Sequence, residues 1–129
     1  MKLFRIDGSL IIDKPEINYK KELVEYCVRE GISLQYANLY NANLYNANMQ
    51  GANMQGANIR YANMRNADMQ GANMRNANMQ YADMRSVNMR GADLRSANMR
   101  NADMQGAKMQ GANMRNADMR GADMQDSDL

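Results

Sequence analysis

Charged side chains recur at intervals of twenty residues along most of this sequence. Asp83, Asp103 and Asp123 form one such series. Carboxylates held close together could bind a cation, since oxygen ligands suit hard metal ions. A carboxylate row of this kind is more commonly solvated and balanced by nearby arginine, so the sequence predicts no metal site and no cofactor.

Two series of arginines have the same spacing. The first is Arg75, Arg95 and Arg115, and the second is Arg60, Arg100 and Arg120. If residues twenty apart are stacked, these guanidinium groups would form two basic rows and attract an anionic partner. The plainer interpretation is a solvated charged face. These six arginines are the candidate interaction residues.

Nothing in the sequence forms a catalytic set. There is no histidine and no threonine, and Cys27 is the single cysteine, with no partner base. A lone cysteine of this kind is expected to be a small buried apolar residue. The glycines are single and recur in a five-residue pattern, which is typical of turns and not of a phosphate-binding loop. We therefore predict no catalytic residues and no enzyme activity.

The spacing of these side chains follows from a five-residue repeat that runs from Ile32 to Leu129. A large apolar residue stands at every fifth position from Leu34 onwards, and it is most often methionine. Alanine usually lies two positions before it and Asn or Asp one position before it. A period of five fits neither an α-helix nor a continuous strand. It predicts short extended segments between turns, with alanine and methionine pointing inward and the polar residues outward.

The position two residues after each large apolar residue predicts the corners. Sorted by twenty, one column of this position contains only glycine, namely Gly51, Gly71, Gly91 and Gly111. Type II turns with a positive φ are expected there. At Tyr36, Tyr61 and Tyr81 a positive φ would be costly, so a different turn is expected at those corners.

The run ANLYNANLYNANMQGANMQGANIR resembles the pentapeptide-repeat family, whose consensus is A(N/D)LXX. The resemblance covers residues 32–129 and implies an all-β fold, a right-handed quadrilateral parallel β-helix with four units per coil and about five coils. The sequence departs from the consensus mainly by placing methionine where leucine or phenylalanine is usual.

Residues 1–31 do not repeat and are predicted to form an N-terminal hairpin and capping helix. Asp7-Gly8 favours a tight turn between strands at 2–6 and 9–12. The boundaries are thus 1–31 for the cap and 32–129 for the β-helix.

The capping helix is predicted over residues 18–30. Asn18 is a suitable N-cap, and Gly31 is a suitable stop. A solenoid needs its apolar end covered, and this helix is expected to cover it.

The C-terminal coil has no comparable cap. Its large apolar residues are Met109, Met114, Met119, Met124 and Leu129. Two interpretations remain open. Asp126 and Asp128 could deter edge pairing by their charge, or two copies could dock end to end as a symmetric homodimer. The family resemblance implies the second, because members often pair through their C-terminal coils.

The charge balance bears on function. The chain has 16 basic and 14 acidic residues, a net charge of +2. DNA mimicry toward type II topoisomerases, known in the resembled family, needs a strongly negative surface and is therefore disfavoured. Ice binding is disfavoured by the absence of threonine.

The expected function is a non-enzymatic structural or protein-interaction module with an unknown protein partner. An alternative is an anionic partner bound through the arginine-rich faces. We do not expect nucleic acid or a membrane as partners. With no secretion signal in the N-terminal residues, a cytoplasmic location is predicted.

Overall fold

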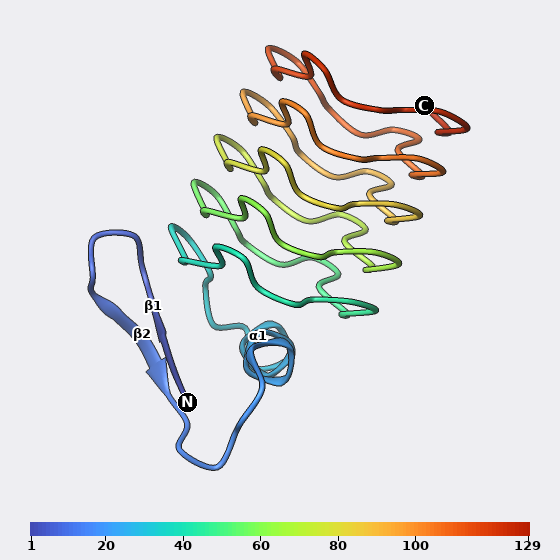
Figure 1. The fold of residues 1–129 in the computed structure, drawn as a ribbon. Coiled ribbons are helices and arrows are strands. Elements are labelled where there is room, and N and C mark those ends of the chain that lie inside the picture. Colours follow the sequence, from blue (N-terminus) through green and yellow to red (C-terminus); the bar gives the residue numbers. More distant parts are fainter.

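The computed structural model describes residues 1–129 and shows a right-handed quadrilateral β-helix with a cap at its N-terminal end (Figure 1). The non-repeating segment forms strand β1 (Lys2–Phe4), strand β2 (Leu10–Asp13) and helix α1 (Lys20–Arg29). The repeats then wind into stacked coils up to Leu129. The fold class implied by the family resemblance is confirmed.

Every backbone N–H of a typical repeat unit has a hydrogen-bond partner, as in the unit Ala57 to Tyr61. The Ala57 N–H closes the turn onto the Met54 carbonyl, at 3.0 Å. The N–H of Asn58 bonds back to the previous coil, and those of Ile59 and Tyr61 bond forward to the next coil. The fifth N–H, that of Arg60, is satisfied by the Oδ1 atom of Asn58 at 3.3 Å. Each unit therefore needs a coil on both sides and a side-chain acceptor of its own.

This last bond explains the Asn or Asp before each large apolar residue. The side-chain oxygen accepts the N–H two residues on, an Asx turn that these residue types favour. Ser33 does the same through its hydroxyl, which accepts from the Gln35 N–H at 3.3 Å. Lys108 stands at the equivalent position, but its side chain carries no acceptor.

We predict that Lys108→Asn stabilises the protein. It supplies an acceptor for the Gln110 N–H, and a net gain of about 0.5–1.5 kcal/mol is expected for such a bond. Asn98→Ala, which removes the equivalent acceptor from the Arg100 N–H, should shift stability the other way by a similar amount. Urea unfolding of both variants measures this, and a Lys108→Asn variant no more stable than the parent would contradict it.

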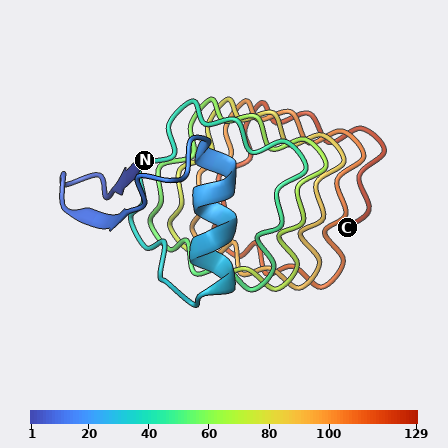
Figure 2. The ribbon, with the colours of Figure 1, turned by 90° about the horizontal axis from the view of Figure 1, so that it is seen from below.

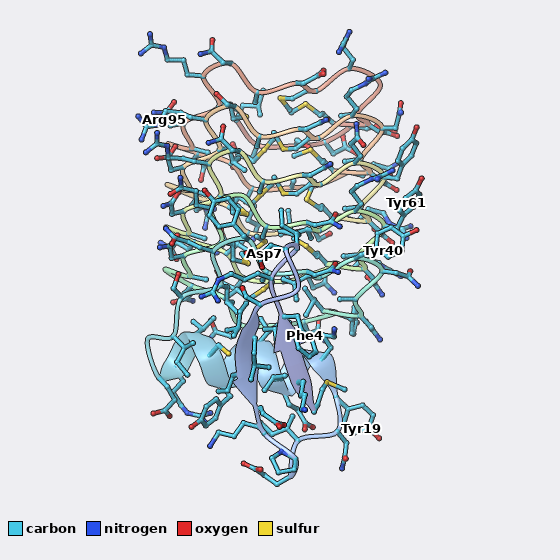
Figure 3. The ribbon with its side chains drawn as sticks, turned by 90° about the vertical axis from the view of Figure 1, so that its left-hand side faces the viewer. Phe4, Asp7, Tyr19, Tyr40, Tyr61 and Arg95 are labelled. Carbon is cyan, nitrogen blue, oxygen red and sulfur yellow. The ribbon has the colours of Figure 1, made fainter.

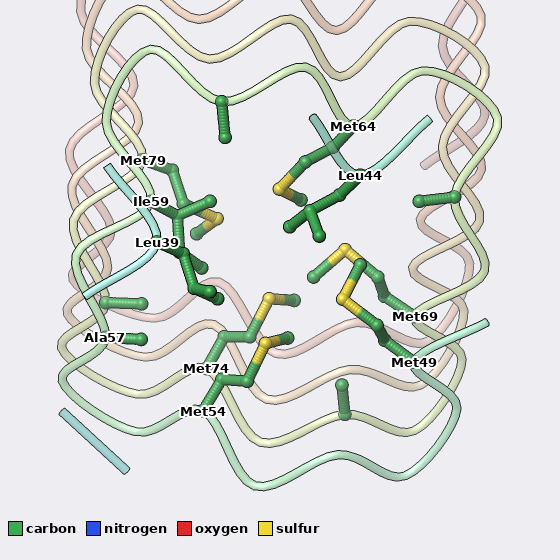
Figure 4. Close-up of a cluster of buried hydrophobic side chains, with 14 of the residues drawn as sticks. Leu39, Leu44, Met49, Met54, Ala57, Ile59, Met64, Met69, Met74 and Met79 are labelled. Atoms are coloured by element: carbon green, nitrogen blue, oxygen red, sulfur yellow. The ribbon is translucent and has the colours of Figure 1, made fainter. Parts of the chain in front are cut away.

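The core is a stack of alanine and methionine side chains. The alanines and the large apolar residues from Leu34 to Met109 are buried, with exposed fractions of 5% or less. Figure 4 shows them in columns, with Met54 beside Met74 and Met49 beside Met69, all pointing to the axis. No polar residue is buried among them. The predicted inward face is thus the observed one.

The predicted exception at the tyrosine corners is wrong. Tyr36, Tyr61 and Tyr81 have φ values of 56°, 59° and 59°, like the glycine and asparagine corners. Every corner forms the same turn, because the N–H that follows the corner closes it and, in every coil but the last, the corner N–H bonds to the next coil. These two bonds, together worth about 1–3 kcal/mol, offset a left-handed cost of about 1–2 kcal/mol.

The left-handed cost should be measurable at a serine corner. Ser96 has a φ of 57°, so Ser96→Gly is expected to raise the free energy of unfolding by about 1 kcal/mol. The reverse change, Gly91→Ser, is matched, because Gly91 has a φ of 64° and no atom near its missing Cβ. It should lower stability by a similar amount in the same denaturant titration. A change of stability in the same direction in both variants would contradict a left-handed cost at these corners.

The N-terminal hairpin is hydrogen-bonded to the first coil. β1 pairs antiparallel with β2, and beyond β1 Arg5 bridges Ala37 of the first coil. The turn at Asp7-Gly8 is as predicted, with Gly8 at a φ of 86°. The Ser9 N–H and hydroxyl donate to Asp7, and these hydrogen bonds lower the pKa of the Asp7 carboxyl.

Helix α1 lies across the N-terminal opening of the solenoid, as Figure 2 shows from below. Leu23, Val24 and Cys27 are fully buried in the same cluster as the repeat core. Burial raises the pKa of the Cys27 thiol, which fits the structural role predicted for it.

The C-terminal end of α1 is as predicted from the sequence, whereas its N-terminal cap is not. Gly31 ends the helix as predicted, at a φ of 68° and with its N–H bonded to Val28, while the Ile32 N–H bonds to Cys27. This is the Schellman arrangement. The predicted N-cap is wrong, because Tyr19 occupies that position and no side chain caps the helix.

Candidate functional site

Hollows in the surface lie only beside α1. The larger, about 530 Å³, lies between the start of α1 and the first coil and includes Lys20, Lys21 and Tyr45. The second lies near Arg29 and Gln50. Neither contains a nucleophile beside a base, so the flat faces of the solenoid are the better candidates for function.

Four faces are named here by their large apolar residues. Face 1 is centred on 34, 54, 74, 94 and 114, and face 2 on 39, 59, 79, 99 and 119. Face 3 is centred on 44, 64, 84, 104 and 124, and face 4 on 49, 69, 89, 109 and 129. Because bridges join residues twenty apart, each face is a continuous ladder.

Arginine is held by a carboxylate wherever Asp precedes it by two residues. Arg95 is bound by Asp93 on face 1, with an Nη2 to Oδ2 distance of 2.6 Å and a second bond through Nε at 2.8 Å. Arg120 and Asp118 form the same two-bond pair on face 2. Both members of a pair point outward from one short segment, so the pair needs no help from other coils.

The other four candidate arginines have no ion pair. They follow asparagine instead of aspartate and are Arg75, Arg115, Arg60 and Arg100. The candidate set of six thus divides into two neutralised arginines and four unneutralised ones. The positive charge of faces 1 and 2 therefore comes from these four residues.

The acidic series on face 3 is occupied by protein donors. Arg85 binds Asp83 at 2.6 Å and reaches Asp103 at 3.4 Å. Gln105 donates to Asp123 at 2.8 Å. No group of three or more carboxylate, thiol or imidazole side chains is arranged to hold a metal ion.

Three exposed tyrosines meet at the edge between faces 2 and 3, and we call them the tyrosine ladder: Tyr40, Tyr61 and Tyr81. The rings of Tyr61 and Tyr81 are parallel within 4°, with centroids 5.1 Å apart. Tyr40 meets Tyr61 edge-on at 5.6 Å. Figure 3 looks onto this side of the molecule, with Tyr40 and Tyr61 at one edge and Arg95 at the other.

Arg60 belongs to the ladder as well. Its guanidinium carbon lies 5.5 Å from the centroid of the Tyr61 ring, and its Nε atom is buried without a hydrogen-bond partner. A ring face therefore takes the place that a carboxylate has beside Arg95 and Arg120. The sequence indicates that Tyr61 and Tyr81 stack, but not that Tyr40 joins them, because Tyr40 stands at a different position of the repeat.

The last coil is open along the solenoid axis. Met114, Met119 and Met124 are only partly buried, and Leu129 is 68% exposed, whereas Met109 is 1% exposed. The N–H groups of these three methionines have no further coil to bond. The predicted end residues thus divide into one buried residue and four that form an apolar opening.

The family model for pentapeptide repeats matches residues 30–60, 52–91 and 97–129, in eight copies. The chain belongs to the pentapeptide-repeat family. Pentapeptide-repeat proteins are typically structural or interaction modules. Comparison with curated protein sequences finds no match.

Two solved structures show the same fold. A pentapeptide repeat protein from the thylakoid lumen of Arabidopsis thaliana has a TM-score of 0.65 at 22% identity, over 84% of this chain and 68% of that one. A trypsin-treated variant of QnrB1, a plasmid-mediated fluoroquinolone resistance protein, has a TM-score of 0.63 at 18% identity, over 70% of this chain and 46% of QnrB1. At such identities the likeness concerns the fold alone. No helix of the chain has the length and apolar character needed to cross a bilayer.

The paired aspartates should titrate abnormally. Side-chain and backbone hydrogen bonds from Arg120 lower the pKa of Asp118 to about 2, from an ordinary value of 3.8. The folded state thus binds this proton more weakly than the unfolded state does. The stabilisation from the pair is present above about pH 4 and is lost as the pH falls towards 2.

We predict that Arg120→Gln returns the pKa of Asp118 most of the way to 3.8, as measured by NMR titration of the carboxyl carbon. Arg100→Gln is the control, since Arg100 lowers the same pKa only weakly through its charge. Equal shifts in the two variants would show that the bidentate pair is not the cause.

Proposed function

We propose that this chain is a non-catalytic interaction module that presents faces 1 and 2 to an anionic protein partner. The observation that carries the proposal is the set of four arginines without ion pairs on two adjacent faces. The fold supports it, because hydrogen bonds in every unit fix the spacing of these side chains. The absence of a nucleophile beside a base in either hollow supports a non-catalytic role.

Surface charge favours this function over DNA mimicry. A mimic of the duplex must present rows of uncompensated carboxylates. Here Asp83, Asp93 and Asp118 are each bound by an arginine at 2.6 Å. The unneutralised charges of faces 1 and 2 are positive, so these faces suit a partner of opposite charge.

The test is affinity capture with two charge-reversed variants. Arg75→Glu/Arg115→Glu changes face 1, and Arg65→Glu/Arg90→Glu makes the same change in net charge on faces 3 and 4. We expect the face 1 variant to capture at least about tenfold less of the partner than the parent protein does. The control should capture as much as the parent. Equal losses would mean that net charge and not this face is responsible.

We also propose that the coil formed by residues 110–129 packs against the same coil of a second copy. Its partly buried methionines and unbonded N–H groups support this, since another coil would cover the methionines and accept hydrogen bonds from the N–H groups. Light scattering after gel filtration should show a dimer of the 129-residue chain.

Met119→Glu should shift that dimer to monomer, while Arg120→Glu in the same unit should not, because Arg120 points outward. A monomer at every concentration of the parent protein would refute the dimer and leave the interaction module intact.

A further inference from the structure

The tyrosine ladder is the one part of the surface where aromatic rings gather without being covered. Tyr40, Tyr61 and Tyr81 are 54%, 43% and 47% exposed. Each of these side chains thus leaves close to half of its surface in solvent, although burial is the main gain from aromatic side chains in a monomer. The exposed aromatic area therefore suits a ligand that can stack on it.

The stack has an open end at Tyr81. Side chains at the corners lean toward the next coil, as shown by the Tyr36 ring, which occupies the space above Gly56. Beyond Tyr81 the same column continues with Asn101 and then Gly121. The only ring that pairs with Tyr81 is that of Tyr61. Tyr61 thus covers one face of the Tyr81 ring, and the other face looks toward Asn101, which brings no second ring, while 47% of the residue stays exposed.

The surroundings of the ladder on face 2 are rich in hydrogen-bond donors. Arg60 and Arg100 have no carboxylate partner. The Oδ1 atoms of Asn58, Asn78 and Asn98 accept backbone N–H groups, so each amide offers its NH₂ group to the outside. A ligand on this side must therefore supply acceptors and negative charge.

The carboxylates closest to the ladder are held by arginines to different extents on its two sides. On face 2 the first is Asp118, which Arg120 binds. On face 3 Asp83 and Asp103 both lie within ion-pair distance of Arg85. On the face 3 side of the ladder two carboxylates thus share one arginine, whereas the face 2 side carries the free arginines, so a phosphate chain is expected on the face 2 side.

We propose that the tyrosine ladder binds single-stranded nucleic acid. A base stacks against the exposed part of the Tyr81 ring, and Arg60 and Arg100 hold the neighbouring phosphates. Exposed aromatic rings beside arginine are the means by which proteins bind single strands without reading sequence. An acidic peptide would also meet the arginines, but it would not need parallel flat rings.

Single-strand binding would be a second activity beside that of a protein-interaction module, and the net charge of the chain does not predict it. A net charge of +2 over the whole surface gives little attraction for a long duplex. A short single strand needs only a local patch. The grouping of Tyr40, Tyr61, Tyr81 and Arg60 provides that patch, and it depends on how the coils stack.

The test titrates the whole 129-residue protein into fluorescein-labelled strands of twelve uridines or twelve thymidines at low salt. Binding is measured as a rise in the fluorescence anisotropy of the strand. Binding of either strand in the micromolar range is expected, and the two strands show whether RNA or DNA is preferred. A blunt duplex of the same length should bind at least tenfold more weakly, because its bases are already stacked.

Matched variants locate the site. Tyr81→Asn should weaken binding by about 5- to 150-fold, the range for loss of one base–aromatic stack. Tyr36→Asn makes the same change at another corner of positive φ and should leave binding unchanged. Arg100→Gln should reduce the slope of log affinity against log salt by about 0.7, whereas Arg115→Gln on face 1 should not. Circular dichroism confirms that each variant is folded.

Several outcomes would overturn the proposal. These are no binding of either strand at any protein concentration up to the millimolar range, duplex bound as well as single strand, or equal loss in Tyr36→Asn and Tyr81→Asn. Displacement of the strand by polyglutamate with the Tyr81→Asn variant unaffected would instead assign the face to an acidic protein. None of these results alters the outcome of the face 1 capture experiment.

Discussion

The structure depends on the backbone hydrogen bonds that join each coil to its neighbours. Away from the ends of the solenoid, each unit gives two N–H groups to the next coil and one to the previous coil, closes its own turn with a fourth and, except at Lys108, satisfies the fifth with an Asn or Asp side chain. No unit is complete alone, so the coils order one another. This explains why a core built largely from flexible methionine still fixes its surface side chains in straight rows: the backbone, and not the packing of thioethers, sets their positions.

Much of this could be predicted from the sequence. A five-residue period with alanine and methionine inward determines the core, and sorting by twenty determines the faces. The ion pairs were also within reach, because residues two apart on an extended segment point the same way, so Asp93 and Arg95 had to be neighbours. The net charge of a face does not show which of its arginines are paired. Face 1 has a net charge of +2. That value alone does not reveal that Arg95 is neutralised while Arg75 and Arg115 are not.

Other features could not be predicted from the pattern. The tyrosine corners were expected to avoid a positive φ because a side chain there is strained, but local strain is outweighed by bonds to two other parts of the chain. Tyr40 joins the ladder from another position of the repeat, which depends on the lean of side chains toward the next coil. The start of α1 is set by how the chain enters the first coil, so Asn18 does not act as the cap that its residue type suggests.

The four-sided coil gives insertions an unusual effect. Because one unit is a quarter of a coil, five inserted residues leave the inward pattern of alanine and methionine intact. They would nevertheless rotate everything after the insertion by one side. After an insertion between Arg75 and Arg95, for example, Arg95 and Arg115 would line up with Arg60 on face 2 and no longer with Arg75 on face 1. Twenty inserted residues would only lengthen each row. In a chain of this design, small changes in length can therefore rearrange the surface completely while the core keeps its composition and its stability.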